Sequence, residues 1–560
     1  MKKLLPLLLL SVFFGFSQTT NKGEPASWSL NSNQKITKIE ISTIDIQKIV
    51  EEDAINDLVA AKPYRIGVLT EIDYGFESGV WTNLPNGDRF WRLNISSKDA
   101  LNLSVNFDNF YLPEGARLYL YNNEKSDLQG AYTSINNNNS NILGSWFVDG
   151  DNLWIEYFEP SNVKGQGSLH LTNIIHGYRL AGKHQLFTEE QKALNDSGNC
   201  NQDVDCPVGA DFEPIKNEVK HSIAFLNLGN GFICSGGLIN NVNNDKTPYF
   251  LTANHCFNAG GGTNPAQYSM RFNWITSGTP RCGTTTNTQQ GPMNFVMNGS
   301  TLKAKSEQSD FMLVELNNAI NPTWDIRYSG WDRTDTNPTF EVGIHHPSGD
   351  IMKVCRDDSG ASKVNVGGVP TWFIGGLNNS NQATFGTNGW EIGVTEGGSS
   401  GSPLFDQNGR VIGQLWAGLA ACTGTNDNNK YDYYGRFATS WIGDGTNSTR
   451  LSNWLDPDNT GATTVDTLDH ATAAINDELL AANINVYPNP TSSNITIDLG
   501  NLSGKFNFKV INTLGQEVLV GKINNTTTSI NLSNLTSSIY LIKVTDTSNN
   551  RSFVKKVIKK

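Results

Sequence analysis

The sequence predicts an all-β protein built from several domains. Apolar residues recur at every second position in short segments such as 91–95 and 118–121, which is the period of a strand with one buried face. Asn, Thr, Ser and Gly are abundant, a composition typical of loop-rich extracellular β proteins. Because 560 residues exceed the size of one compact core, we expect three or four domains.

The first residues predict export. Lys2 and Lys3 precede an apolar run over 4–16, and small polar residues follow at 17–19. The run contains Pro6 and is shorter than the roughly 18–20 residues that a spanning helix needs. We therefore expect a signal peptide at 1–18, a secreted or cell-surface protein, and no transmembrane anchor.

The rest of the chain divides by its cysteines and its alternation pattern. Residues 19–192 contain strand patterns but no cysteine and no candidate site, and we interpret them as a β-rich propeptide; a permanently attached β domain is the alternative. The polar patch at 189–192 suits a cleavable junction. The cysteines lie within a block at 193–470, followed by an expected linker at 471–483 and a small β-sandwich at 484–560.

Charge and cysteine spacing exclude two classes of function. The net charge is −12 and no basic stripe is present, so nucleic-acid binding has no electrostatic basis. None of the 7 cysteines has the spacing of a zinc site, and we predict neither a metal nor another cofactor.

Three segments of the cysteine block together indicate acyl transfer. Glycines flank Ser400, and the N–H groups of Gly398 and Ser400 could converge as an oxyanion hole. His255 ends an apolar strand at 250–255 and is a candidate base. Asp310 heads the apolar run 311–316, where a buried charge needs a partner such as a histidine Nδ1–H.

In this chain order, and with these flanking residues, segment 197–470 resembles the lysyl endopeptidase branch of the trypsin-like serine proteases. Further matching motifs lie at 330–333, 344–347, 393–396, 413–415, 434–436 and 451–457. The resemblance implies a double β-barrel protease domain in which His255, Asp310 and Ser400 form the catalytic triad. The expected fold is all-β, with this domain between a β-rich propeptide and a small β-sandwich.

The resemblance also implies a specificity pocket. Asp432 matches the aspartate that binds a basic P1 residue, and a substrate ammonium would relieve the cost of burying that carboxylate. We expect lysine as the P1 residue and leave arginine open. Trp416 and Gly418 would line the groove, and Trp372 matches a tryptophan on which some relatives stack a histidine at the position of Trp416. An Asp432 exposed in a polar loop and a purely structural Trp416 are the alternatives.

The resemblance further implies three disulfides, Cys200–Cys422, Cys206–Cys282 and Cys234–Cys256, with Cys355 left unpaired. Ser399 stands where trypsin has the aspartate that pairs with the freed N-terminus, so this activation trigger is absent. Removal of 19–192 would instead unblock the site or complete folding, and cleavage near Lys192 would allow self-maturation.

The final segment resembles the C-terminal sorting domains of type IX secretion, on 487–490, 512–516 and the basic end 555–560. This implies the outer-membrane secretion machinery as a partner; an adhesive or carbohydrate-binding module is the alternative. We predict a secreted serine endopeptidase acting on proteins or peptides after lysine. A protease of different P1 preference and a non-enzymatic binding protein on a protease scaffold are the other hypotheses.

Overall fold

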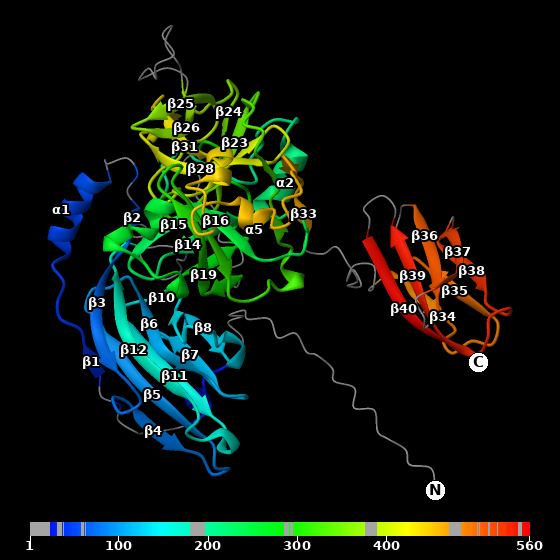
Figure 1. Cartoon of the computed structure of the whole chain (residues 1–560). Coiled ribbons are helices and arrows are strands. Elements are labelled where there is room, and N and C mark those ends of the chain that lie inside the picture. The colour runs from blue at the N-terminus through cyan, green and yellow to red at the C-terminus, as the bar shows by residue number, and fades with distance from the viewer. Residues whose placement is uncertain are drawn as a thin grey trace. The chain divides into compact units, whose positions relative to one another are not determined.

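The computed structural model contains two compact units, Met1–His470 and Ala471–Lys560 (Figure 1). It describes residues 23–30, 36, 38–57, 61, 63–179, 196–284, 291, 295–375, 389–469, 483–500, 502, 505–512, 516–523, 525–546 and 551–560. The expected signal peptide, the junction at 189–192 and residues 471–482 of the expected linker lie outside these ranges. No helix in the described ranges is both long and apolar enough to cross a membrane.

The first unit opens with a β-sandwich. One sheet has the order β1–β5–β11–β7–β8 with β4 beside β5, and the other has the order β10–β6–β12–β3 with β9 beside β6. Alternate residues of both sheets, such as Leu93, Leu120 and Val105, fill a shared core. The strands are β1 (Lys38–Glu40), β3 (Gly67–Tyr74), β4 (Val80–Asn83), β5 (Arg89–Ser96), β6 (Asn102–Tyr111), β7 (Arg117–Tyr121), β8 (Leu128–Tyr132), β9 (Leu143–Gly144), β10 (Val148–Asp149), β11 (Asn152–Glu159) and β12 (Ser168–Gly177).

Helix α1 (Ile46–Asn56) precedes most of these strands. The Asp45 side chain accepts a hydrogen bond from the Lys48 N–H, which satisfies one of the free donors at the start of the helix.

Two larger, mainly antiparallel sheets follow. An eight-stranded sheet has the order β18–β17–β14–β15–β16–β20–β19, with the short strand β2 beside β15. Its strands are β2 (Tyr64–Arg65), β14 (Ile223–Asn227), β15 (Phe232–Leu238), β16 (Tyr249–Ala253), β17 (Ser269–Phe272), β18 (Val296–Asn298), β19 (Ser300–Ser306) and β20 (Phe311–Leu316).

A ten-stranded sheet has the order β13–β24–β23–β27–β28–β31–β26–β25, with β22 and β32 at its side. Its strands are β13 (Gln202–Asp203), β22 (Trp331–Asp332), β23 (Glu341–His345), β24 (Lys353–Asp357), β25 (Ser362–Val366), β26 (Val369–Ile374), β27 (Pro403–Asp406), β28 (Val411–Gly418), β31 (Asp432–Arg436) and β32 (Thr464–Val465). Short two-stranded ladders join β21 (Arg327–Tyr328) to β33 (Leu468–Asp469) and β29 (Cys422–Thr423) to β30 (Asn426–Asp427).

The two sheets share one buried core, in which Leu251 and Leu313 of the first sheet pack in the same cluster as Val342 and Phe405 of the second. The helices at their margins are short: α2 (Glu213–Val219), α3 (Asn254–Phe257), α4 (Phe437–Ile442) and α5 (Ser452–Leu455). The prediction of an all-β fold is confirmed.

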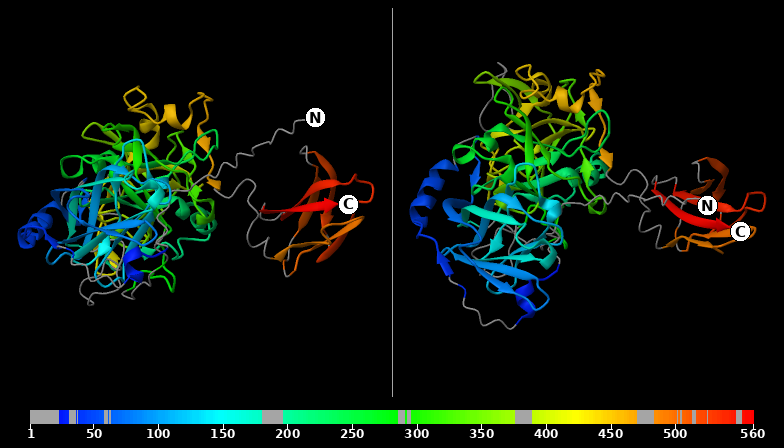
Figure 2. Two further views of the ribbon diagram at one scale, coloured as in Figure 1. Left: turned by 90° about the horizontal axis from the view of Figure 1, so that it is seen from below. Right: turned by 60° about the horizontal axis from the view of Figure 1, so that its bottom comes forward.

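The N-terminal sandwich contacts the eight-stranded sheet directly (Figure 2). The Asn227 side chain donates to the Ser145 carbonyl at 3.3 Å, and the Asn298 side chain donates to the Gly144 carbonyl at 2.9 Å. An apolar cluster that includes Ile66 and Ile233 lies between the two parts.

Three disulfides cross-link this unit: Cys200–Cys422, Cys206–Cys282 and Cys234–Cys256. They are the pairs that the resemblance implied. Cys355 is free and fully buried on β24.

The second unit is a small sandwich. One sheet contains β34 (Asn485–Tyr487), β35 (Asn494–Asp498) and β38 (Thr527–Asn531); the other contains β36 (Phe506–Ile511), β37 (Glu517–Ile523), β39 (Ser538–Asp546) and β40 (Arg551–Lys559). Alternate residues such as Ile495, Ile497 and Ile542 form its core, as the alternation in the sequence predicts.

The Cys206–Cys282 disulfide closes a segment with a sequence separation of 76 residues, so its removal should enlarge the entropy of the unfolded chain. We expect a Cys206→Ala/Cys282→Ala double variant to lose about 2–4 kcal/mol of stability. Urea unfolding in a Ser400→Ala background, where self-cleavage does not contribute, measures this loss. The control is Cys355→Ala, which keeps all three disulfides; an equal loss in both variants would contradict the expectation.

Candidate active site

His255 is positioned by the end of β16 and by a disulfide. It lies in the short helix α3, and Cys256 beside it is bonded to Cys234 of β15. The Asn254 N–H donates to the Asp310 carbonyl at 2.8 Å, which joins the start of α3 to the segment that precedes β20. His255 and Asp310 therefore come from adjacent strands of one sheet.

The His255 side chain is hydrogen-bonded to the Asp310 carboxylate. Nδ1 of His255 lies 2.6 Å from Oδ2 of Asp310, and the His255 backbone N–H donates to Oδ1 at 2.8 Å. Burial raises the pKa of Asp310, and the charge and hydrogen bonds of His255 oppose this shift. Because the carboxylate accepts at Nδ1, the neutral imidazole presents its lone pair at Nε2, which has no hydrogen-bond partner among the described residues.

Ser400 lies in a turn that rests on β15 and β16. Gly398 and Gly401 have φ angles of +93° and +81°, a region that favours glycine. The Ser235 hydroxyl donates to the Gly398 carbonyl at 2.9 Å, and the Ser235 N–H donates to the Ser400 carbonyl at 2.8 Å. A Cβ at Gly401 would lie 2.1 Å from Oγ1 of Thr252, so no side chain fits between the turn and β16. Within the described part of the chain, the N–H groups of Gly398 and Ser400 donate no hydrogen bond.

The Ser399 hydroxyl is held by hydrogen bonds with uncharged groups. Nδ1 of His345 lies 2.8 Å from Oγ of Ser399, and the Glu396 N–H donates to the same oxygen at 3.2 Å. Burial lowers the pKa of His345 to about 3, so this histidine is uncharged at neutral pH. The turn before Ser400 is thus braced by hydrogen bonds where trypsin uses an ion pair.

Asp432 is a fully buried carboxylate with one oxygen held and the other free. Oδ2 accepts from Nε1 of Trp390 at 2.7 Å and from the Thr395 hydroxyl at 2.8 Å. Oδ1 has no hydrogen-bond partner in the described ranges. Burial raises the pKa of Asp432 to about 6, against the opposing hydrogen bonds of Trp390 and Thr395. The alternative of an exposed Asp432 is wrong, because its exposed fraction is 0%.

Gly418 and the two predicted tryptophans differ in their relation to Asp432. Gly418 pairs with Asp432 across β28 and β31, and a Cβ there would lie 1.7 Å from Oδ1. Trp416 is partly buried on β28, 6.2 Å from the ring of Tyr433. Trp372 is buried in the core and donates to the Ile412 carbonyl at 2.9 Å. Among the described rings, no contact joins Trp372 to Trp416, so the structure does not bring this pair together.

Trp390 and Thr395 were not predicted as site residues. Thr395 lies in the motif at 393–396, which is one of those that carry the resemblance. Its position just before the Ser400 turn could have identified it as a site residue. No local pattern marks Trp390, because its contact to Asp432 spans 42 residues of sequence.

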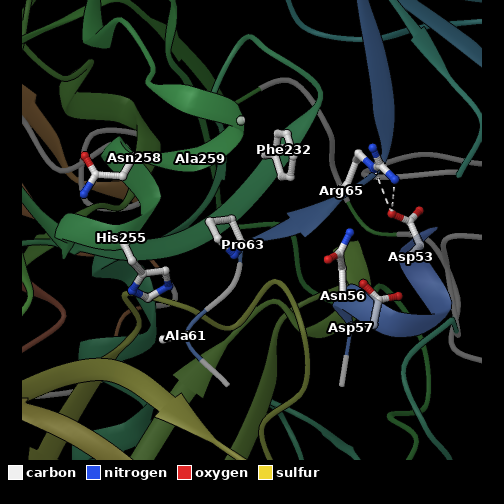
Figure 3. Close-up of a pocket in the computed structure, with 11 residues that line it drawn as sticks. Asp53, Asn56, Asp57, Ala61, Pro63, Arg65, Phe232, His255, Asn258 and Ala259 are labelled. Atoms are coloured by element: carbon white, nitrogen blue, oxygen red, sulfur yellow. Dashed lines mark hydrogen bonds and ion pairs between the residues drawn. The ribbon is translucent and has the colours of Figure 1, made fainter. Parts of the chain in front are cut away.

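The sequence analysis placed no site within 19–192, and here the structure differs. Strand β2 pairs with β15, and a Cβ at Gly397 would lie 2.7 Å from Cδ2 of Tyr64. Ala61, Pro63 and His255 line a common cavity of about 340 Å³ (Figure 3). The first part of the chain therefore reaches the catalytic histidine candidate.

The described residues offer one cluster with metal-ligating atoms close together, formed by Cys234, His255 and Cys256. Its two sulfurs are joined in a disulfide and are not thiolates, so the cluster does not have the donors of a metal site.

Comparisons with known proteins give matches to two parts of the chain. Residues 194–435 match the family model for the lysyl endopeptidase C-terminal domain, and residues 485–560 match the model for the secretion system C-terminal sorting domain. The chain is 24% identical over 371 residues to the lysyl endopeptidase of Pseudomonas aeruginosa, covering 64% of this chain and 75% of the relative.

Two solved structures are also similar to part of the chain. Rv3671c from M. tuberculosis H37Rv, in an inactive mutant form, is 13% identical with a TM-score of 0.24 and covers 40% of this chain and 84% of its own. Deg5 is 14% identical with a TM-score of 0.23 and covers 41% of this chain and 90% of its own. Because these scores are low, the fold assignment is based on the strand topology.

These matches support a protease-type domain in the middle of the chain. The match of residues 194–435 to the lysyl endopeptidase C-terminal domain, and of residues 485–560 to the sorting domain, confirms the resemblance found in the sequence.

A strong hydrogen bond between His255 and Asp310 should be visible in solution. We expect a downfield proton NMR signal from the His255 Nδ1–H that disappears in His255→Gln and moves upfield in Asp310→Asn, because the amide is a weaker acceptor than the carboxylate. The control is His170→Gln, which removes a histidine of the N-terminal sandwich. An unchanged signal in Asp310→Asn would contradict the geometry.

Proposed function

We propose that this protein is a secreted serine endopeptidase that hydrolyses peptide bonds on the carboxyl side of lysine, with arginine a second P1 residue to be tested. The observation that carries the proposal is the buried Asp432 carboxylate, held at one oxygen and free at the other, in a domain that also holds the His255–Asp310 pair. A buried carboxylate without a countercharge is costly, and a lysine ammonium would supply that charge. The same feature disfavours a protease selective for acidic P1 residues.

The proposed reaction begins with Ser400. Nε2 of His255 removes the hydroxyl proton as Oγ of Ser400 attacks the scissile carbonyl carbon. The N–H groups of Gly398 and Ser400 are the donors proposed for the developing oxyanion, since they have no described partner within the protein. His255 then protonates the leaving amine, and the acyl-enzyme remains. Water, deprotonated by His255, hydrolyses this ester and restores the serine.

Asp310 orients the base. Its two contacts to His255 hold the tautomer with the proton on Nδ1, and its negative charge stabilises the imidazolium that forms during the reaction. A Cβ at Gly418 would lie 1.7 Å from Oδ1 of Asp432, so only glycine fits beside this oxygen, and Gly418 is proposed to line the pocket next to it. Trp416 is proposed as a wall of the groove on the same strand. We assign Trp372 no contact with substrate, because it is buried in the core.

The terminal regions carry the proposed route of export and activation. The sorting domain would engage the outer-membrane secretion machinery, after a signal peptide at 1–18 directs the first export step. Residues 19–192 are proposed as a propeptide that is removed by cleavage near Lys192, and the mature enzyme would act outside the cell or at its surface.

Cleavage-site profiling of an unstructured protein by the processed enzyme tests the function. We expect cuts after lysine, and a loss of several orders of magnitude in kcat for Ser400→Ala and for His255→Ala, because both act in the bond-making step. Cuts after other residues would support the proposed protease activity but contradict the assignment of Asp432 to the P1 specificity pocket. Near-wild-type turnover in either variant would contradict the assignment of that residue to the catalytic triad.

The pH dependence of specificity tests Asp432 separately. Only the ionised carboxylate pairs with a lysine ammonium, and the pKa of Asp432 is about 6. As pH falls through this value the carboxyl gains a proton, so the ratio of kcat/KM for a lysine substrate to that for its norleucine analogue should fall. Taking the ratio cancels any pH dependence that the two substrates share.

Asp432→Asn provides the matched control for the pH experiment. It should have a lower ratio that is flat between pH 5 and pH 8. The same pH-dependent fall in wild type and Asp432→Asn would show that another group causes it.

A further inference from the structure

We propose that Gln414 is a positioning residue of the catalytic triad, which holds the Ser309 carbonyl and thereby fixes the neighbouring Asp310. Gln414 lies on β28 in the ten-stranded sheet, whereas Asp310 directly precedes β20 of the eight-stranded sheet. The contact therefore joins the two sheets at the acid of the proposed triad. The inference rests on the proposed function, since it assigns a further role in the same reaction.

Asp310 has a backbone conformation that depends on support from its surroundings. Its φ angle is +55°, in the left-handed region that is uncommon for residues other than glycine. Such a conformation persists only where the surrounding structure holds it, and it is found most often at functional sites. Because the peptide group between Ser309 and Asp310 is planar, its orientation sets this φ angle, and the contacts of that group maintain it.

Three hydrogen bonds hold the segment of Ser309 and Asp310. Nε2 of Gln414 donates to the Ser309 carbonyl at 2.6 Å, and the Ser309 hydroxyl lies 2.8 Å from the Ser440 hydroxyl of α4. The Asn254 N–H donates to the Asp310 carbonyl at 2.8 Å. Of these three contacts, only that of Gln414 acts on the peptide group that sets the φ angle of Asp310.

The neighbouring strand makes space for this hydrogen bond. Gly435 of β31 pairs with Gln414 across the two strands. A Cβ at Gly435 would lie 1.8 Å from the Ser309 carbonyl oxygen and 2.3 Å from Nε2 of Gln414. Glycine is therefore required at this position so that the hydrogen bond can form, which gives a physical reason for the glycine in the motif at 434–436.

Stability alone does not account for an amide at position 414. The Gln414 side chain is fully buried, and its Oε1 has no hydrogen-bond partner among the described residues. The cost of burying this unpaired oxygen offsets the gain from the hydrogen bond of Nε2, so the side chain adds little net stability. A carbonyl oxygen can only accept, so the amide must present Nε2 to Ser309. The retained amide therefore points to a requirement for a donor at the Ser309 carbonyl.

The residue after Gln414 holds the turn of the proposed nucleophile. The Gly401 N–H donates to the Leu415 carbonyl at 2.9 Å, and the Leu415 N–H donates to the Ser402 carbonyl at 2.9 Å. Gly401 and Ser402 directly follow Ser400. Two consecutive residues of β28 therefore contact the segment of the acid and the turn of the nucleophile, which belong to different sheets.

Loss of the Gln414 donor should misplace the carboxylate of the triad. Without this hydrogen bond the Ser309–Asp310 peptide can relax toward a negative φ, and the carboxylate then shifts relative to Nδ1 of His255. A displacement of about 1 Å at a catalytic group can cost roughly 100-fold in rate. The proposed lysine contact at Asp432 does not involve this peptide, so the effect falls on kcat and leaves KM nearly unchanged.

The first test compares Gln414→Met with wild type, both in processed form, on a lysyl amide substrate. We expect kcat to fall about 10- to 100-fold while KM changes by less than about twofold. The downfield proton signal of the His255 Nδ1–H should move upfield, because the displaced carboxylate is a weaker acceptor. The control is Asn240→Leu, which removes a buried side-chain amide that donates to the Asp466 carbonyl at 3.0 Å. This control should lose stability but keep the kcat of wild type.

Gln414→Glu keeps the size and shape of the side chain and decides the question if the methionine variant fails to fold. A protonated carboxyl can donate to the Ser309 carbonyl, whereas an ionised carboxylate can only accept and is repelled. Burial should raise the pKa of the introduced carboxyl. The ratio of its kcat to that of wild type should therefore fall about tenfold between pH 5 and pH 9. Asn240→Asp, a matched change of a buried amide to an acid, should show a flat ratio.

The outcomes separate this inference from the proposed function. If Gln414→Met keeps the kcat and the His255 signal of wild type, or if the ratio for Gln414→Glu is flat with pH, the positioning role is overturned and the proposed function stands. A kcat that falls only in step with the folded fraction of the variant overturns it as well. If wild type does not hydrolyse the lysyl substrate, or if Ser400→Ala hydrolyses it equally well, the proposed function itself fails.

Discussion

The cost of burying a carboxylate is the constraint on which the catalytic half of this protein depends. Asp310 and Asp432 are both withdrawn from water, where an ionised carboxyl is stable only if donors surround it. Asp310 is satisfied at both oxygens by His255, and the result is an oriented imidazole with a free Nε2. Asp432 is satisfied at one oxygen only, and the unsatisfied oxygen is the proposed binding position for a substrate cation. One physical requirement thus accounts for both the proposed base and the proposed specificity.

How much of the fold and the site could be predicted depends on how far apart in the sequence the interacting residues lie. The segments around His255, Asp310 and Ser400 carry local signals: an apolar strand end, a charge at the head of a buried strand, and a glycine turn. The alternation in the N-terminal and C-terminal segments likewise predicted their sheets. By contrast, the donors that hold Asp432 come from a distant loop, and only the folded chain brings Trp390 to it. Trp372 was matched to a tryptophan of the relatives because both are tryptophans. The residue type alone, however, does not show whether a tryptophan lies in the core or in the substrate groove.

The N-terminal region shows the same limit. Strand β2 is two residues long, too short for alternation to be seen, and its partner strand begins at Phe232, far along the chain. Its environment combines strand pairing, apolar burial and the ion pairs of Arg65, so this short strand forms only where both parts of the first unit meet. The contact between Ser399 and the uncharged His345 is also long-range in sequence, and it braces the turn before Ser400 without a newly freed N-terminus.

The most direct measurement of the central claim is covalent labelling of the processed enzyme with a peptide chloromethyl ketone that ends in lysine. Such a reagent must place its lysine in the specificity pocket before its reactive carbon can alkylate the base beside the serine. The account predicts a single adduct, located by mass spectrometry on His255, and much slower labelling of Asp432→Asn than of wild type. An adduct on another residue, or equal labelling of wild type and Asp432→Asn, would contradict it.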